Sequence, residues 1–241
     1  MLSGDRDFGL FKIALAAADS LEQPRWRRDG RAWSYRWRYD AGIVVGFRAE
    51  PAADCVVLRY EVENRTGAPL PRVLVHPCIV TTRAPSFFAP AVGAGDDPSP
   101  SKRSAPHAEL FGRVWLWRCG ERFAFADLDL TPEEPHTAVM RAGEPPVAWA
   151  WWVNSSAVFD ESLIVLEASH ASGSLGIWFE EAVWASVNAG DERACVHLFP
   201  SFGDLAPGER GVVHGRLLIS ELGVDATRRW LLDQRRAAPL Q

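Results

Sequence analysis

The segment from Ala194 to Leu218 constrains the fold most, because it contains two apolar strand-like runs separated by a loop rich in proline and glycine. Side chains alternate faces along an extended strand, so Cys195 and His197 share one face and Val196 takes the other. Pro207-Gly208 then marks a turn before the second run. We therefore predict a β-hairpin here, with a thiol and an imidazole side by side on its first strand.

A second hairpin is predicted near the beginning of the chain, where two tryptophan-containing runs flank Asp29-Gly30. A two-residue loop at these positions places Trp26 opposite Trp33 across the strand pair. The aromatic row continues on the same face through Tyr35 and Trp37. Such a row fills the inner face of a sheet, or it forms an open platform on which sugar rings stack.

The rest of the chain repeats short runs of β-branched and aromatic residues at the spacing of a β-sandwich. The runs lie at 43–47, 55–62, 72–80, 113–117, 122–125, 147–153, 163–166, 176–179 and 182–187. Residues 81–107 show no periodicity and are predicted to form a long irregular loop. Residues 225–235 are predicted to form a helix that starts at Asp225. The fold class that follows is all-β, an antiparallel two-sheet sandwich in one domain, 1–241, with a short C-terminal helix.

Charge and cysteine usage exclude several classes of protein. The 241 residues carry a net charge of −5, which argues against nucleic acid as a partner, because such proteins need clustered excess cation. No apolar run has the length of a membrane span, so no membrane partner is expected. The first residues lack the pattern of a secretory signal, which predicts a cytoplasmic protein. The four cysteines have no framework spacing, so we expect reduced, buried thiols.

Several motifs resemble those of a known group of proteins. They are the run from Val57 to Thr66, Cys195-Val196-His197, Gly203-Asp204-Leu205 and Pro207-Gly208-Glu209. Together they resemble uncharacterised bacterial β-sandwich proteins related to the supersandwich, or galactose mutarotase-like, fold. The resemblance implies a sandwich of supersandwich type and a context linked to carbohydrate. Epimerases of this group use a histidine with a glutamate on the concave face of the sheet, which makes His197 the candidate base and leaves its acidic partner unassigned.

The candidate site residues follow from these patterns. The ligand-binding candidates are aromatic or histidine residues: Trp33, Trp37, Trp149, Trp151, His76 and His197. On the predicted strand before the long loop, His76 and Cys78 share a face, as Cys195 and His197 do on theirs. Side by side, the two strands would present a Cys2His2 set of the kind that binds zinc. Because spacing within strands does not show that the strands are neighbours, we expect no metal and no cofactor.

Three functions are compatible with these patterns. The first is a non-catalytic protein that binds carbohydrate or accompanies its processing. The second is a sugar epimerase-like or lyase-like enzyme that uses His197 as a general base. The third is a structural or oligomerisation protein whose aromatic rows only pack sheets together.

Overall fold

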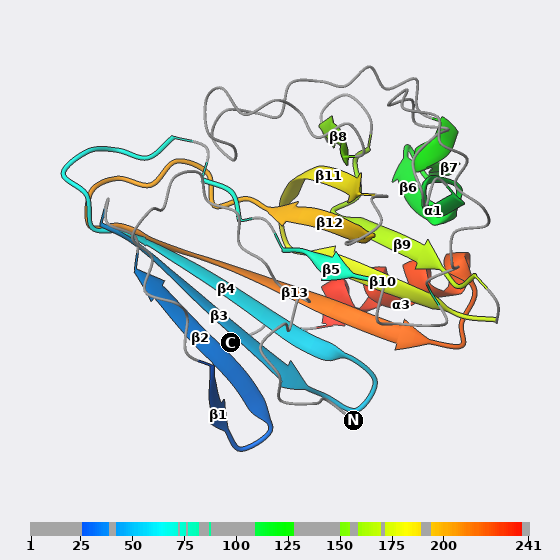
Figure 1. Ribbon diagram of the computed structural model, residues 1–241, viewed down its shortest axis with the longest axis horizontal. Helices are drawn as coiled ribbons and strands as arrows, with labels where there is room; N and C mark the ends of the chain where they lie inside the picture. The colour runs from blue at the N-terminus through cyan, green and yellow to red at the C-terminus, as the bar shows by residue number, and fades with distance from the viewer. Residues whose placement is uncertain are drawn as a thin grey trace, which may run out of the picture.

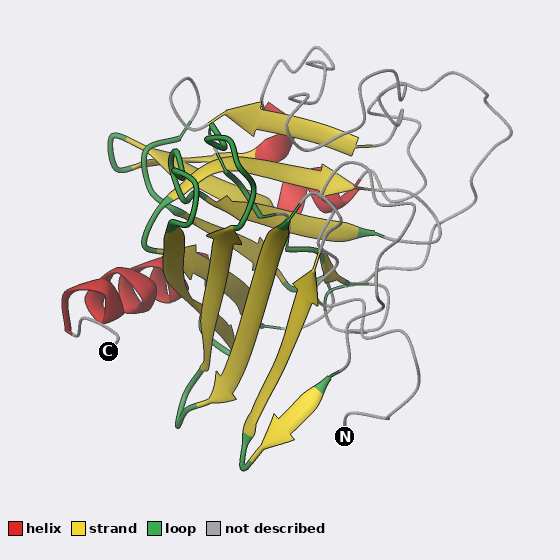
Figure 2. Cartoon of the chain, turned by 90° about the vertical axis from the view of Figure 1, so that its left-hand side faces the viewer, coloured by secondary structure: helices red, strands yellow, loops and turns green. Residues whose placement is uncertain are grey.

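The structure is a computed structural model that describes residues 26–38, 42–71, 73–75, 77–81, 87, 109–127, 150–154, 159–169, 172–188 and 194–237. Within these residues the strands form two antiparallel sheets, which lie one above the other (Figures 1 and 2). The prediction of an all-β sandwich with a C-terminal helix is confirmed. Most of the predicted loop 81–107 lies outside the described residues.

The large sheet has nine strands. In spatial order they are β1 (Arg27–Asp29), β2 (Ala32–Arg38), β3 (Ile43–Pro51), β4 (Val56–Asn64), β13 (Arg210–Ser220), β10 (Ser174–Phe179), β9 (Leu163–Glu167), β6 (Val114–Arg118) and β7 (Glu121–Ala124). The small sheet has four strands, in the order β5 (Ile79–Val80), β12 (Cys195–Pro200), β11 (Ala182–Asn188) and β8 (Ala150–Asn154).

The main core lies between the two sheets. Val196 and Leu198 of β12 pack in the same buried cluster as Leu58 and Tyr60 of β4. Alternation along β12 therefore directs Cys195 and His197 to the opposite face of the small sheet, as the sequence predicted. Burial of these large apolar side chains supplies the main driving force for stacking the two sheets.

A row of aromatic rings crosses the inner face of the large sheet. Ring centroids are separated by 4.6 Å between Trp26 and Tyr35, 5.1 Å between Tyr35 and Phe47, and 4.7 Å between Phe47 and Tyr60. Phe179 continues the row at 5.8 Å from Tyr60. These distances are typical of favourable ring pairs, so the row ties four strands and the segment before β1 together.

Helix α3 (Val224–Ala237) covers the other face of the large sheet at β9, β10 and β13 (Figure 2). Its Leu231 is fully buried in a second apolar cluster with Trp178 and Leu218. Gly176 lets the helix approach, because a Cβ there would lie 2.6 Å from Thr227 Cγ2. Two shorter helical segments, α1 (Glu109–Arg113) and the 3-10 turn η1 (Phe125–Asp127), were not predicted. None of the described helices is long and apolar enough to cross a membrane.

The predicted hairpin between residues 194 and 218 is wrong. β12 belongs to the small sheet and β13 to the large sheet, so these consecutive strands do not pair. The loop between them instead forms isolated bridges with the segment after β4, Leu70 with Leu205 and Leu74 with Ser201. The chain therefore changes sheets at the proline-rich and glycine-rich loop, which turn residues alone do not distinguish from a hairpin.

The tryptophan hairpin exists, but its register is shifted by one residue. Asp29 pairs with Ala32, so the two loop residues are Gly30 and Arg31. Of these two, only Gly30 has a positive φ, 59°, as in a type II′ turn, which takes glycine at its first central position. The predicted pair of Trp26 and Trp33 is therefore wrong, and Trp26 packs on Tyr35 instead.

The predicted strand 72–80 shortens to Ile79–Val80. Pro77 has no N–H to donate to a sheet ladder, which explains why regular pairing begins only after it. The backbone carbonyl of Pro77 instead accepts a hydrogen bond from a side chain of β12.

Candidate functional site

A buried cluster of two cysteines and one histidine lies on the outer face of the small sheet. Cys195 and His197 come from β12, and Cys78 directly precedes β5, the neighbouring strand. The register pairs Cys195 with Val80 and Val196 with Ile79, so one further step places Cys78 next to His197. The two sulfur atoms and the nearest imidazole nitrogen all lie within 4.8 Å of one another.

The imidazole of His197 is held at both nitrogens. Nδ1 lies 2.9 Å from the carbonyl oxygen of Pro77, and Nε2 lies 3.0 Å from Sγ of Cys195. A carbonyl oxygen only accepts, so Nδ1 carries the proton and donates it to Pro77. Nε2 of the neutral ring therefore presents its lone pair to Sγ of Cys195.

Burial keeps this imidazole neutral. The residue is 4% exposed, and removal from water lowers the pKa of His197 to about 4, against a smaller opposite effect of the hydrogen bond to Pro77. The ring nitrogens make hydrogen bonds with the Cys195 side chain and the Pro77 carbonyl. The role of His197 as a general base stays a prediction. Because the ring is buried, a substrate in solution does not reach it directly.

The four cysteines differ in exposure. Cys78 and Cys195 are buried, Cys55 is half-buried and Cys119 is exposed, and all four are free thiols. The prediction that all four are buried is therefore wrong for Cys119, and Cys55 is only partly buried. It lies in the tight turn between β6 and β7, where its φ is 53° and its amide donates to Asp160.

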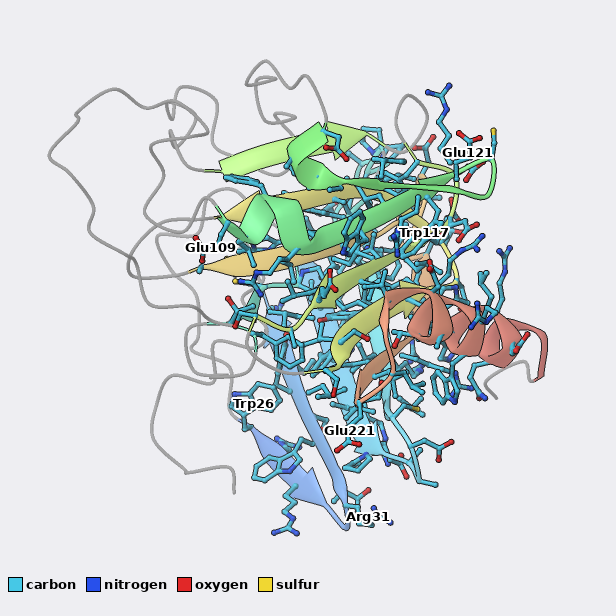
Figure 3. All side chains as sticks on the ribbon, turned by 90° about the vertical axis from the view of Figure 1, so that its right-hand side faces the viewer. Trp26, Arg31, Glu109, Trp117, Glu121 and Glu221 are labelled. Carbon is cyan, nitrogen blue, oxygen red and sulfur yellow. The ribbon has the colours of Figure 1, made fainter. Side chains whose placement is uncertain are left out.

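A second candidate site lies at the β1 edge of the large sheet. Trp26 and Trp33 are each 38% exposed, and Arg28 places its guanidinium 5.7 Å from the centre of the Trp33 ring. Trp33 shares a strand face with Tyr35, which is 3% exposed and belongs to the main core. In Figure 3, Trp26 lies beside this edge, far from Trp117 and α3. At this edge, the inner face of the sheet therefore presents two partly exposed indoles to solvent.

The other predicted ligand-binding residues are spread over the fold. Trp37 lies in β2, four residues after Trp33, and Trp151 lies in β8 of the small sheet. Trp149 and His76 lie outside the described residues. The structure thus brings Cys78, Cys195 and His197 together and separates all three from Trp33.

Sequence reasoning missed a pair formed by an imidazole and a carboxylate. Nδ1 of His214 lies 3.1 Å from Oε2 of Glu180, which also accepts from the His214 amide at 2.9 Å. The pair forms because Phe179 of β10 is aligned with Gly215 of β13. The two strands are antiparallel, so Glu180, which follows Phe179, faces His214, which precedes Gly215. Nε2 of His214 makes no hydrogen bond with any residue that the structure describes. An acidic doublet such as Glu180-Glu181 is typical of a solvated turn, and only the register reveals the pair.

A buried cation lies on the same face of β13 as His214. Arg216 is 7% exposed, and its Nη1 lies 3.7 Å from Sγ of Cys55. In the described part of the chain, no carboxylate forms an ion pair with this guanidinium. Arg216 is thus a buried cation two residues from His214 along β13.

No protein-family model matches the sequence, and a search of curated proteins finds no match. The chain is similar in structure to an aldose epimerase homologue from C. elegans, with 8% identity, 84% of this chain and 70% of that chain covered, and a TM-score of 0.48. A galactose mutarotase related enzyme from Lactobacillus acidophilus gives 8% identity, coverage of 84% and 72%, and a TM-score of 0.44. A galactose mutarotase-like protein from Lactobacillus casei gives 11%, 87% and 73%, and 0.42.

Proposed function

We propose that the protein binds carbohydrate without catalysis, at the β1 edge of the large sheet. The observation that carries this proposal is the pair of indoles, Trp26 and Trp33, each 38% exposed at the edge of a face on which Tyr35 and Phe47 are buried. Sugar rings present flat C–H faces that stack on indoles, with hydroxyl groups at their rims. The motif resemblance seen in the sequence implies the same class of ligand.

The platform is held in place before a ligand arrives. Trp26 packs edge-on against Tyr35 at an interplanar angle of 87°, and it lies 6.0 Å from Phe47. Both supporting rings are 3% exposed, so they are fixed by the core. A rigid aromatic group loses little conformational entropy on binding, which leaves more of the stacking energy for affinity.

An exposed arginine lies over one of the indoles, because the Arg28 guanidinium is 5.7 Å from the centre of the Trp33 ring. Arg27, Arg28 and Arg31 belong to β1 and its turn, and guanidinium groups present several N–H donors in a plane. Such donors bind pairs of adjacent hydroxyl oxygens at the rim of a stacked sugar ring. The Arg28 side chain is positioned by its own hydrogen bond, from Nε to the Gly30 carbonyl oxygen at 3.1 Å.

The same edge is poorly suited to pairing with another sheet, which argues against the oligomerisation alternative. β1 is only three residues long, and its sequence is Arg-Arg-Asp. Short, charged edge strands oppose the addition of a further strand. At the far edge, β7 begins with the charged pair Glu121-Arg122.

Calorimetric titration against a panel of neutral and acidic oligosaccharides tests the proposal. We expect Trp33→Ala to weaken the binding of a panel sugar by about tenfold or more, the size of an interface hot-spot effect. Ile219→Ala is the matched control, because Ile219 is a 62% exposed apolar residue on β13. Wild-type protein that binds no sugar, or equal weakening by both variants, would reject the proposal.

A second candidate function, proton transfer on a sugar, is favoured by the pairing of His214 with Glu180. A carboxylate on Nδ1 orients an imidazole and leaves Nε2 to act on a substrate. The test is the rate of anomer or epimer interconversion, followed by polarimetry or NMR. Catalysis lost by about a hundredfold in His214→Gln, with sugar binding at Trp33 intact, would establish this function. Equal rates of interconversion in the variant and the wild type would rule out this second function.

A further inference from the structure

We propose that Cys78, Cys195 and His197 bind a zinc ion on the outer face of the small sheet. This assigns a metal to a cluster for which spacing along the sequence predicts none. That spacing leaves open whether the two strands are neighbours. Pairing of β5 with β12 shows that they are.

The donor atoms have the chemistry and the spacing of three of the four ligands that zinc takes in proteins. Two sulfur atoms and one imidazole nitrogen lie within 4.8 Å of one another, so small side-chain rotations bring all three to a common ion at zinc–ligand distances of about 2.0–2.3 Å. Sulfur and imidazole ligands favour zinc, whereas calcium and magnesium require oxygen ligands. The set therefore specifies the class of metal.

The histidine already has the orientation of a metal ligand. Its Nδ1–H donates to the Pro77 carbonyl oxygen at 2.9 Å, which fixes the tautomer and directs the lone pair of Nε2 toward Sγ of Cys195, 3.0 Å away. Metal-binding histidines commonly donate their second N–H to a backbone carbonyl or a carboxylate in this way. Pro77 therefore acts as a positioning residue for His197.

Charge balance also allows a divalent ion at this buried position. Cys78 and Cys195 are 7% and 2% exposed, and a buried unbalanced charge is costly. A zinc ion with two thiolates and one neutral imidazole has no net charge. Each thiol releases one proton to solvent as the zinc–sulfur bond forms, and no oxidation or reduction takes place.

The backbone holds the ligands in a fixed arrangement. Cys195 and His197 lie two residues apart on β12, and β12 is flanked by β5 and β11 in the small sheet. Because the cluster is buried, the ion must enter before the fold closes or during local opening. We therefore expect zinc to resist chelators in the native protein and to be released on unfolding.

The first experiment measures zinc by mass spectrometry in full-length protein produced in zinc-supplemented medium. We expect about one zinc per chain, retained after dialysis against EDTA and released to a colorimetric indicator in guanidinium chloride. Refolding with cobalt should give visible d–d bands and a near-ultraviolet band from sulfur-to-cobalt charge transfer. The cobalt spectrum shows directly that sulfur atoms bind the metal. A cluster that only packs in the core, without binding metal, gives no such bands.

The matched variants are Cys195→Ser and Cys119→Ser, because Cys119 is exposed and lies outside the cluster. We expect Cys195→Ser to lower zinc content by at least about tenfold, while Cys119→Ser keeps it unchanged. Should Cys195→Ser fail to fold, the cobalt spectrum of wild-type protein still decides. Protein that refolds fully with zinc or cobalt present but holds neither would overturn the proposal, as would a disulfide between Cys78 and Cys195 in the native protein.

Discussion

Nδ1 of His197 lies 2.9 Å from the carbonyl oxygen of Pro77, which ties the middle of β12 to the segment entering β5. The two residues are 120 positions apart in the chain. Pro77 interrupts the predicted strand because it has no N–H, and its carbonyl oxygen accepts from Nδ1, which leaves Nε2 facing Sγ of Cys195. The same residue thus explains both where β5 begins and which nitrogen of His197 faces the cluster.

The stability of the zinc-free protein should fall as pH decreases from about 6.5 to about 4. The folded pKa of His197, about 4, is below its usual value of 6.5, so the unfolded chain takes up a proton more readily. The stability that the neutral His197 ring contributes is therefore fully present above pH 6.5 and is lost as the pH falls to about 4. A shift of this size corresponds to about 3 kcal/mol, as an order of magnitude. Denaturant titrations at several pH values measure it.

The control for that series is His197→Gln, which has no titrating ring. The difference in unfolding free energy between wild type and variant should narrow over the same pH range. A constant difference between the two would contradict the assigned burial of the imidazole.

Replacing Gly30 by alanine should destabilise the protein by about 1 kcal/mol. A Cβ at this position would meet no heavy atom within 4 Å, and φ is +59°, so backbone strain alone produces the effect. Gly67→Ala is the matched control, because Gly67 is also unobstructed but lacks a positive φ. Equal midpoints of denaturation for the two variants would contradict the assigned turn.

Gly176→Ala should weaken the docking of α3 on the large sheet. A Cβ there would lie 2.6 Å from Thr227 Cγ2 and 2.7 Å from Leu231 Cδ1, and overpacking of this kind costs about 1–3 kcal/mol. Thr227→Ser removes the nearer methyl group but keeps the hydroxyl that lies 2.6 Å from Ser174 Oγ. In a double-mutant cycle we expect the two substitutions together to cost less than their sum. Strict additivity would show that the helix does not approach here.

The four thiols should react with a thiol reagent in order of their exposure. Cys119 is exposed and should react first in the native protein, whereas Cys78 and Cys195 are buried and should react only on unfolding. Mass spectrometry of quenched samples identifies the labelled residue. Early labelling of Cys195 would contradict the burial of the cluster, and Cys119→Ser checks the assignment of the fast reaction.

Local patterns predicted most of the secondary structure correctly. Alternation placed Cys195 and His197 on one face of β12, and the apolar side of residues 225–235 identified α3. Local patterns failed to predict which strands pair with each other and in which register. The turn residues before β13 suit a hairpin and a crossing between sheets equally well, and the loop after β1 permits two registers. In both cases the competing arrangements satisfy the same local preferences.

The candidate sites divide in the same way. Trp33 is a ligand-binding candidate by its position in an aromatic row, because stacking residues are recognisable by type, and this role stays a prediction. Glu180 cannot be identified as the partner of His214, since the two residues lie 34 positions apart and meet only through the register of β10 and β13. The hydrogen bonds that join the His197 ring to Cys195 and Pro77 involve no carboxylate, so its predicted acidic partner stays unassigned.

The sequence by itself determined the strand periodicity, the class of fold and the face of each strand to which chemically active side chains point. These properties depend on backbone geometry, which acts over a few residues. Tertiary structure alone decided that Cys78 lies beside His197, that Glu180 binds His214, and that the aromatic row reaches solvent at Trp26 and Trp33. Each of these depends on which strands become neighbours, and that choice is made by burial of the whole apolar surface between the sheets.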